Sequence, residues 1–404
     1  MARRTVDLFC GCGGLTTGLV QAGFDVVAGV DGWKDAITVY KANHESEKHD
    51  CLVHDLSDVE GTIELVSKYR PFLIAGGPPC QDFSSAGHRE EGDRADLTVK
   101  YAKVIAGVKP VAFIMENVPR AALSAAFAQA KTILSEAGYG LSFAVLNAAH
   151  HGVPQLRKRM FLIGMLGEQD GFLDKSIKAG RSEKPMTVRE FLIQQGEQPE
   201  FEHYYRHPRS YERRGVYSID EPSATIRGVN RPKSATYNTH DNDTASGPEV
   251  KALSLAQRAH IQTFRKNYFD VSGVSNAAKE QMVGNAVPVN LAYYVAERLR
   301  THIEAKFFEA RSDGLTAEVA EQAKNHTAEI LALMENTGKP FGGDVATHAQ
   351  EIFEAFAALQ GETVSVPVDE WASRVLEFKA RADKATPAET AVGDIEDDYR
   401  EAAE

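Results

Sequence analysis

The sequence has few cysteines, no long apolar run and no overall excess of positive charge. Its 404 residues contain four cysteines, Cys10, Cys12, Cys51 and Cys80, too few for the disulfide framework of a small secreted domain. Cys10 and Cys12 are not followed by a second Cys or His pair at metal-ligand spacing, so we interpret them as small residues in a tight loop. Because no stretch approaches about 18 uninterrupted apolar residues and the N-terminus is charged, we expect a cytoplasmic protein without a membrane span or secretory signal.

The negative charge of the chain is concentrated at its C-terminal end. The net charge is −12, and residues 311–404 carry 20 acidic and 8 basic side chains, so the first 310 residues are neutral overall. With 43% hydrophobic and 25% charged residues, the composition is that of an ordinary globular chain of two or three domains. The neutral body is therefore compatible with a polyanionic partner, whereas the acidic end would repel one.

A locally basic segment lies within the neutral body, between His203 and Lys233. Tyrosines interleave with its cations, which include six arginines: Arg206, Arg209, Arg213, Arg214, Arg227 and Arg231. Arginine and tyrosine together suit phosphate contact and the reading of base edges in nucleic acid. A solvated polar loop region would have the same composition, so that alternative stays open on composition alone.

The hydrophobic pattern predicts alternating strands and helices over residues 1–167. The predicted strands are 6–9, 24–30, 51–54, 72–75, 111–115, 141–146 and 160–163, and the predicted helices are 15–22, 34–43, 58–69, 96–108 and an Ala-rich helix to about 137. This order is typical of an α/β fold with a doubly wound, mostly parallel sheet.

The alternation stops after Gly167, and helical character returns from Ala252, with a long helix predicted at 287–308. We therefore expect four segments. Residues 1–167 and 251–310 are the two segments of the α/β domain, and 168–250 is a second domain inserted between them. An acidic, mostly helical extension follows at 311–404, with helices at 317–335 and 349–359.

The most informative segment is GGPPCQDFS at 76–84. Pro78 and Pro79 hold their own φ near −65° and keep the backbone stiff and extended. Cys80 lies beyond the carboxyl end of the predicted strand 72–75, at the edge where open α/β sheets bind ligands. A rigid, presented thiol in that place is a candidate nucleophile, and a buried cysteine acting as a small hydrophobe is the alternative.

A Gly-rich turn, DLFCGCGG at 7–14, joins the first predicted strand to the first helix. Bare backbone at a helix N-terminus can hold a nucleotide-like ligand. Asp31 ends the second predicted strand, where a carboxylate can accept hydrogen bonds from ribose hydroxyls, and Asp55 follows the third and could bond an exocyclic amine. These residues predict an adenosine-bearing cofactor without saying which one, and each aspartate taken alone could be an N-cap or turn residue.

Two further motifs bring charged side chains toward the same edge. Glu116 ends an apolar strand beside that of Cys80, so partial burial should raise its pKa toward a useful general-acid value. A carboxylate capping the following helix would occupy the same position. In QLRKR at 155–159, alternate residues of an extended segment share a face, which places Gln155, Arg157 and Arg159 together. These cations could hold a phosphate, a base oxygen or a catalytic carboxylate.

Taken together, the motifs closely resemble those of the cytosine-5 DNA methyltransferases. Five segments follow that family's order and roughly its spacing over about residues 4–300: DLFCGCGG at 7–14, GGPPCQDFS at 76–84, ENV at 116–118, QLRKR at 155–159 and GNAVPVNLA at 284–292. The resemblance implies an S-adenosyl-L-methionine (AdoMet)-dependent fold with a target-recognition domain inserted after QLRKR. It also implies a double-stranded DNA substrate, and hence a nucleoid-associated location.

The resemblance further implies roles for single residues. The Cys80 thiolate would add to carbon 6 of a flipped-out cytosine, and Glu116 would bond N3 and the exocyclic amine. Arg159, with Arg157, would hold O2 and position the other two groups. The implied AdoMet-binding residues are Phe9 for adenine, Asp31 for the ribose, Asp55 for the adenine amine, and Gly11, Gly13, Pro78 and Asn285. The DNA-binding residues expected are Gln81, Ser84 and the six arginines of the basic segment.

Two positions depart from the family pattern. Asp31 stands where members often carry glutamate, and Ile261–Phe264 matches a glutamine–phenylalanine element only loosely. Three other functions compete: a tRNA-methylating branch, which usually carries a Cys-Phe-Thr element that is absent here, an NAD-dependent oxidoreductase, and a DNA-binding module without catalysis. The last two leave Cys80 and Glu116 without a role. A cognate restriction endonuclease is the expected biological partner of such an enzyme.

Overall fold

The protein is described by a computed structural model that covers residues 3–79, 96–208, 213–234, 237–246 and 250–312. The chain divides into two compact units, and the first contains Met1–Arg300, from the first strand to the middle of the last described helix. A second unit begins at Thr301. Within the described residues, no helix is both long and apolar enough to cross a membrane.

A seven-stranded sheet forms the centre of the first unit, in the order β3-β2-β1-β4-β5-β8-β6. Its strands are β1 (Arg4–Leu8), β2 (Asp25–Asp31), β3 (Asp50–Val53), β4 (Leu73–Gly76), β5 (Ala112–Asn117), β6 (Tyr139–Asn147) and β8 (Lys158–Leu166). The first five are parallel, and β8 runs antiparallel to both β5 and β6. The predicted mostly parallel, doubly wound sheet is therefore confirmed.

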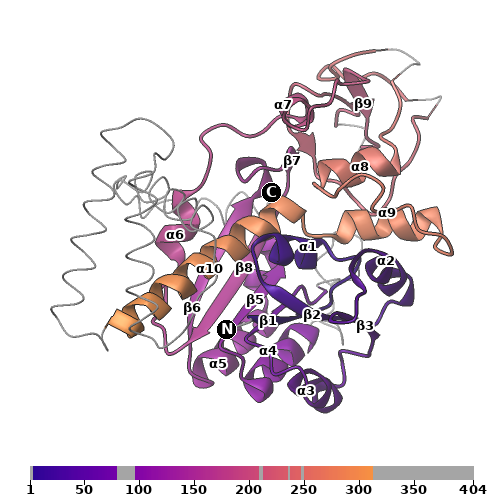
Figure 1. Ribbon diagram of the computed structural model, residues 1–404. Coiled ribbons are helices and arrows are strands. Elements are labelled where there is room, and N and C mark those ends of the chain that lie inside the picture. Colours follow the sequence, from indigo (N-terminus) through magenta and orange to yellow (C-terminus); the bar gives the residue numbers. More distant parts are fainter. Residues whose placement is uncertain (1–2, 80–95, 209–212, 235–236, 247–249, 313–404) are drawn as a thin grey trace, which may run out of the picture. The chain divides into compact units, whose positions relative to one another are not determined.

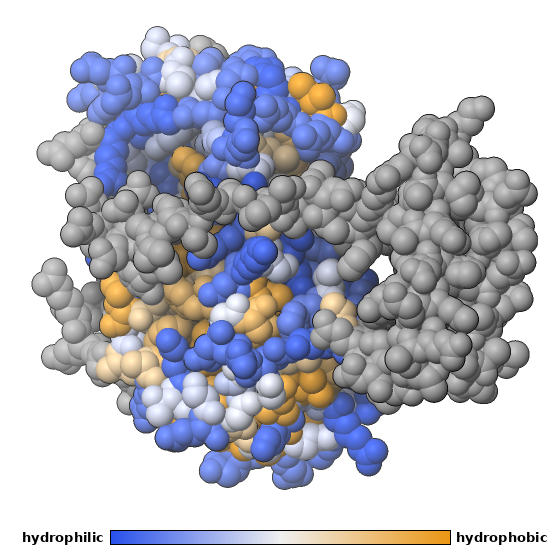
Figure 2. All heavy atoms as spheres, turned by 90° about the vertical axis from the view of Figure 1, so that its left-hand side faces the viewer, coloured by the Kyte–Doolittle hydropathy of each residue, from blue (hydrophilic) through white to orange (hydrophobic). Residues whose placement is uncertain are grey.

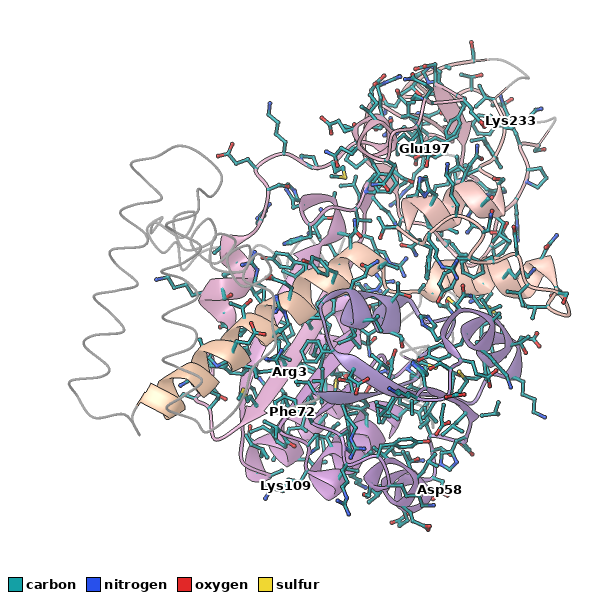
Figure 3. The ribbon with its side chains drawn as sticks, viewed as in Figure 1. Arg3, Asp58, Phe72, Lys109, Glu197 and Lys233 are labelled. Carbon is teal, nitrogen blue, oxygen red and sulfur yellow. The ribbon has the colours of Figure 1, made fainter. Side chains whose placement is uncertain are left out.

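Helices cover the sheet, and Figure 1 shows α10 lying across it. The helices are α1 (Gly14–Gln21), α2 (Lys34–His44), α3 (Val59–Ser67), α4 (Asp96–Val108), α5 (Ala125–Glu136) and α10 (Val289–Ser312), with short 3₁₀ turns η2 (Pro119–Leu123) and η3 (Ala148–His150). Helix α4 packs against both α3 and α5, and the three helices share the main apolar core with the strands. Asp58, labelled in Figure 3, caps α3 by accepting a hydrogen bond from Gly61 N–H.

Helices α1 and α10 approach so closely that only glycine fits at Gly18. A Cβ atom there would stand 2.5 Å from both Ala292 Cβ and Tyr293 N. One turn earlier, a Cβ on Gly14 would overlap the carbonyl oxygen of Val287. The segment around Val287–Tyr293 is thus packed against the start of α1, so the motif at 284–292 lies next to the motif at 7–14 in space.

Several predicted boundaries were wrong by a few residues, for local physical reasons. Strand β1 ends at Leu8 because Phe9 takes a left-handed backbone conformation with φ 56°. Helix α8 (Leu255–Ile261) begins three residues after Ala252 because Ser254 and Gln257 form a capping box there. Helix α10 begins at Val289 and not at 287. The helices predicted at 317–335 and 349–359 lie outside the described residues.

The region predicted to be an inserted domain contains little regular structure. Its elements are α6 (Asp174–Ala179), α7 (Val188–Gln194), β9 (His203–Tyr205), β10 (Val216–Ser218) and β11 (Ser223–Ala224), followed by α8 and α9 (Asn276–Asn285). Strands β9 and β10 form an antiparallel pair, whereas β11 pairs in parallel with β7 (Gln155–Leu156). The upper part of the view in Figure 2, where α7 and β9 lie in Figure 1, is mostly hydrophilic.

Candidate functional site

The predicted site residues converge on the carboxyl edge of the parallel strands. The ends of β3, β2, β1, β4 and β5 are neighbours, because Asp31 pairs with Val53, Leu8 pairs with Val30 and Gly76, and Gly76 pairs with Met115. The strand order reverses at β1 and β4, which is the kind of switch point at which such sheets bind ligands. The Gly-rich turn, the Gly76–Pro79 backbone and Glu116 all leave the sheet at this edge.

The Gly-rich turn leaves room for a ligand on one side and contacts protein on the other. A Cβ atom on Gly11 would meet nothing within 4 Å, and this residue has φ 54°. On Gly13, with φ 97°, a Cβ would stand 2.5 Å from His44 Nε2 and 2.7 Å from the Tyr268 hydroxyl. Phe9 is half-buried and holds a positive φ that is rare for an aromatic residue, a form of strain found at ligand sites.

The two aspartates of the predicted cofactor site differ in environment. Asp31 is half-buried, and its carboxylate accepts hydrogen bonds from the backbone N–H of Gly11 and of Trp33, both at 2.8 Å. Burial raises the pKa of Asp31, against these backbone bonds. A carboxylate has about four acceptor sites, so these two bonds leave acceptor sites on Asp31 for the ribose contact expected from the sequence. Asp55 is exposed and accepts a bond from Ser57 N–H at 2.9 Å, which lowers its pKa.

Beneath the turn, a buried chain of polar groups starts at Asp7. The Thr16 hydroxyl donates to Asp7 Oδ2 at 2.5 Å and lies 2.9 Å from the Tyr40 hydroxyl, which in turn lies 2.8 Å from His49 Nε2. Asp7 is fully buried, and its Oδ1 has no hydrogen-bond partner among the residues that the structure describes. Burial is the main reason that the pKa of Asp7 is raised to about 7.

This environment predicts a pH-dependent stability that Asp7→Asn removes. Between the usual aspartate pKa near 4 and the folded value of about 7, the folded state binds more protons than the unfolded state. Folding stability should therefore fall as pH rises through this window. The uncharged variant should gain stability over the native chain at pH 8, by up to about 4 kcal/mol, with no such gain near pH 4.

Chemical unfolding at pH 4.5 and pH 8 measures the difference. The exposed strand residue Asp25 supplies the control, since Asp25→Asn removes a carboxylate in contact with water. An equal change in the free energy of unfolding at both pH values for Asp7→Asn would contradict the assignment.

Glu116 and Arg159 form a buried ion pair at the end of β5. Arg159 Nε lies 2.8 Å from Glu116 Oε1, and the two side chains are 13% and 9% exposed. Burial raises the pKa of Glu116, and the nearby guanidinium groups of Arg159 and Arg157 oppose that shift. A Cβ on Gly77 would come within 3.0 Å of Glu116 Oε2, so this glycine lets the carboxylate lie directly against the backbone that leads to Cys80.

Asn117 also holds that backbone, a role that sequence reasoning missed. Its Nδ2 donates to the carbonyl oxygen of Pro78 at 2.9 Å, while its Oδ1 accepts from Val118 N–H at 2.8 Å. The Glu-Asn-Val motif was the available signal, since the residue next to the acid is placed by the same strand end. Cys80 itself, with Gln81, Ser84 and Arg209, lies outside the described residues.

The other three thiols are unsuited to nucleophilic attack. Cys10 and Cys12 are buried and Cys51 is half-buried. Burial raises the pKa of Cys10 far above its usual value, that of Cys12 to about 12 and that of Cys51 to about 11. All three stay protonated near neutral pH. No cluster of three His, Cys, Asp or Glu side chains that could hold a metal ion is found in the described part of the chain.

Arg157 has different partners from those expected. Its side chain is 1% exposed, and its guanidinium donates to the carbonyl oxygens of Ile226, Gly284, Asn285 and Ala286. Only Arg159, of the two arginines, is ion-paired with Glu116. Gln155 and Arg157 do lie on a shared face, because both bond Ile226. The carbonyl oxygen of Ile226 accepts from Arg157, and the N–H of Ile226 donates to Gln155 Oε1 at 2.8 Å.

The arginines of the basic segment fall into two groups. Arg206 donates to Thr225 O, and Arg227 donates to His207 O. Arg214 is ion-paired with Glu221, and its guanidinium carbon lies over the Tyr217 ring, 4.3 Å from the ring centre. These three hold the region together. Arg213 and Arg231 are exposed and form no hydrogen bond or ion pair within the described ranges. Arg213 also lines an open hollow of about 570 Å³ with Arg214, Tyr217, His240 and Asn242.

Asp243 shapes the loop around this hollow and was not singled out from the sequence. Its carboxylate accepts hydrogen bonds from the N–H groups of Gly215, Val216 and His240 and from the Tyr237 hydroxyl. Lys233, labelled in Figure 3, adds its ammonium group 5.8 Å from the centre of the Tyr237 ring. A single aspartate in an irregular loop has no sequence pattern that would identify it.

The sequence and the fold are similar to those of known proteins. Residues 3–301 match the family model described as C-5 cytosine-specific DNA methylase. The Type II methyltransferase M.HgiDI of Herpetosiphon aurantiacus is 44% identical over 301 residues, covering 74% of this chain and 95% of the relative. The Type II methyltransferase M.HindV of Haemophilus influenzae is 46% identical over 300 residues, covering 73% and 96%.

Two solved structures share the fold at low sequence identity. The Entamoeba histolytica methyltransferase EhMeth matches with a TM-score of 0.56 and 17% identity over 75% of this chain and 99% of that chain. The S. pombe Dnmt2 methyltransferase matches with a TM-score of 0.53 and 17% identity over 74% and 98%.

Proposed function

Because this chain belongs to the C-5 cytosine-specific DNA methylase family and so transfers a methyl group from AdoMet to carbon 5 of cytosine in DNA, we propose that it acts on a flipped-out cytosine within one specific double-stranded sequence. The observation that carries this proposal is the buried Glu116–Arg159 pair, which lies against the Gly76–Pro79 backbone at the strand edge. A charged pair kept in a buried place is costly unless it acts on a ligand or is well bonded.

AdoMet supplies an electrophilic methyl group, and the residues of the Gly-rich turn fit it. We assign Phe9 to the adenine ring, Asp31 to the ribose hydroxyls and the exposed Asp55 to the adenine amine. Open space above Gly11 lets a ligand reach the bare backbone there. Gly13 shapes the turn from its protein side, and Pro78 and Asn285 border the methionine end.

The chemistry at cytosine follows from the nature of the ring. Carbon 5 is a poor nucleophile until the Cys80 thiolate adds to carbon 6, which makes carbon 5 electron-rich. Glu116, when protonated, donates to N3 and stabilises the charge that develops during addition, while Arg159 holds O2. Once carbon 5 carries the methyl group, water takes its proton and the thiolate leaves carbon 6. Arg157, enclosed by carbonyl oxygens, acts on neighbouring segments and not on the base.

None of these contacts can form within a stacked duplex, so the base must rotate out of it. Gln81 and Ser84, next to the nucleophile, are proposed to contact the DNA at the flipped base. Among the arginines of the basic segment, exposed Arg213 and Arg231, together with Arg209, are proposed to touch DNA directly, and Arg206, Arg214 and Arg227 to hold the loops that carry them. Phosphate contacts position such a surface, and base-edge contacts specify the sequence.

The double variant Arg213→Ala/Arg231→Ala should weaken DNA binding and lower its salt dependence. Removing one arginine that neutralises a phosphate reduces the slope of log K against log salt by about 0.9, so removing both predicts a reduction of nearly two. Fluorescence anisotropy at several salt concentrations measures this slope. Arg189→Ala is the matched control, because Glu202 and Asp220 already neutralise that guanidinium. Unchanged affinity and slope in the double variant would contradict the assignment.

The overall function is tested by transfer of labelled methyl from AdoMet to unmethylated DNA, followed by bisulfite sequencing. Label on cytosine carbon 5 in one short repeated sequence is the expected result. Label in tRNA and not in DNA would support the alternative tRNA activity. Stabilisation of the chain by NAD in place of AdoMet would support the oxidoreductase.

We also propose a restriction endonuclease partner, since the relatives named above are Type II methyltransferases. DNA methylated by this enzyme should then resist an endonuclease that cleaves the same sequence. Cleavage of DNA that the native enzyme has fully methylated, by every endonuclease that cuts the same sequence, would contradict the proposed partner.

A further inference from the structure

Arg157 lies at the meeting point of two segments that are far apart in the sequence. One arm of its guanidinium, Nη1, donates to Ile226 O at 3.0 Å, and the other, Nη2, donates to Gly284 O and Ala286 O, both at 2.9 Å. Ile226 belongs to the segment Ser223–Gly228, which lies within the inserted region 168–250 and contains β11. Gly284–Ala286 ends α9 and continues into the stretch that packs on the Gly-rich turn.

A second buried side chain repeats the same connection. Gln155 accepts from Ile226 N–H at 2.8 Å and donates to Gln262 Oε1 at 2.7 Å. Gln262 in turn donates to Val283 O at 2.6 Å, and both glutamines are fully buried. The loosely matched element at 261–264 thus supplies the residue that closes this network. Arg157 Nε has no hydrogen-bond partner among the described residues, but both outer nitrogens of the guanidinium and both glutamine amides are bonded. Bonded buried polar groups of this kind fix one arrangement of their neighbours, since removing a partner leaves a desolvated group.

The backbones of the two segments also touch directly. A Cβ on Gly284 would overlap Gly228 N, and a Cβ on Gly228 would overlap Gln281 Oε1. Close contact of glycine backbones leaves no room for relative movement without breaking the bonds of Arg157. Strand β11 continues the contact by pairing Ser223 with Gln155.

Two residues beyond Arg157 on the same segment, Arg159 holds Glu116 at the catalytic edge. We propose that Arg157 is a positioning residue that holds Ser223–Gly228 against Gly284–Ala286. The single segment Gln155–Arg159 then positions three parts of the site: the inserted region 168–250 that is proposed to contact DNA, the stretch 284–286 that is proposed to border AdoMet, and the Glu116–Arg159 pair. This inference rests on the proposed function. It gives Arg157 control over the accuracy of methylation, because a displacement of about 1 Å between reading and reacting groups can reduce a rate by about 100-fold.

The test compares the native enzyme with Arg157→Lys, which keeps the positive charge but cannot span both segments with a planar fork. Single-turnover methylation is measured at saturating AdoMet on the native target, as found by bisulfite sequencing, and on targets altered by one base pair. The ratio of the two rates is the quantity of interest. We expect the rate on the native target to fall about 10- to 100-fold and the ratio to fall at least about fivefold.

A purely structural role would leave that ratio unchanged. Phe127→Leu, in α5 and outside both segments, provides a control that weakens core packing alone, and it should keep the native ratio at any loss of stability. Gly228→Ala displaces the same segments without changing a charge, so it should lower the ratio as well, which keeps the test decisive if Arg157→Lys folds poorly.

A native ratio in both variants, with rates reduced only in proportion to the folded fraction, would overturn the proposal. Failure of the proposed function is distinguishable, because the native enzyme itself would then leave DNA unmethylated, and the inference would fall with it.

Discussion

Cys80→Ser should abolish methyl transfer to DNA while leaving AdoMet binding intact. A serine hydroxyl is not ionised at neutral pH and cannot make carbon 5 nucleophilic by adding to carbon 6, so the rate should fall by at least about 10³-fold. Labelled-methyl transfer under single-turnover conditions measures the rate, and calorimetric titration with AdoMet measures binding. No other cysteine can substitute, because the thiols of Cys10, Cys12 and Cys51 are held protonated by burial.

Cys51→Ser is the matched control for this experiment. Cys51 lies on β3 and is half-buried, so its replacement should change the rate by less than about twofold. A second check uses denaturing gels with DNA that carries 5-fluorocytosine at the target, where the fluorine cannot leave as a proton does. The native enzyme should form a covalent complex and Cys80→Ser should not. Full methylation by Cys80→Ser would refute the nucleophile assignment.

Glu116→Gln should have the second-largest effect. The glutamine amide keeps the size of the side chain but cannot give a proton to N3, and its neutral head leaves the guanidinium of Arg159 without its ion-pair partner in a buried place. We expect the methyl-transfer rate to fall by about 10²- to 10³-fold with AdoMet affinity unchanged. Glu60→Gln, an exposed change on α3, is the control and should leave the rate as it is.

The pH profile of the methyl-transfer rate separates proton donation by Glu116 to N3 from its ion pair with Arg159. Burial raises its pKa above the ordinary value for glutamate. Because the protonated form donates to N3, the native rate should fall as pH rises through this raised pKa, provided that Cys80 supplies its thiolate throughout. In Glu116→Gln this fall in rate at higher pH should be absent, since the glutamine side chain does not titrate. A fall in the variant's rate with the same midpoint pH would show that another group is responsible.

Much of the catalytic part was predictable from the sequence because local patterns determine it. In the first 167 residues, apolar residues that recur every two positions predicted the strands, and those that recur every 3.6 positions predicted the helices. Parallel strands necessarily bring their carboxyl ends to one edge of the sheet. The convergence of the Gly-rich turn, Asp31, Gly77 and Glu116 at that edge followed from chain order alone. Boundaries failed where one residue overrides the pattern, as Phe9 does with its positive φ.

The fate of each arginine could not be predicted in this way. Arg157 and Arg159 differ by two positions and share a motif, yet one bonds four carbonyl groups of distant segments and the other a carboxylate. Likewise, Arg213 and Arg214 are neighbours, and of the two only Arg214 has an ion-pair partner among the residues that the structure describes. A long side chain reaches whatever the fold brings near it, and that is set by contacts between segments far apart in the chain.

The sequence by itself thus determined the class of fold and the family, and it predicted which residues gather at the strand edge, because these depend on residue type, spacing and order. Only the tertiary structure decided how the inserted region 168–250 is attached, through β11 on β7, the Gly228–Gly284 contact and the buried network of Gln155, Arg157 and Gln262. The physical reason is that local patterns act through a few neighbouring residues, whereas the partner of a buried polar group is chosen by the close packing of segments that no local pattern relates.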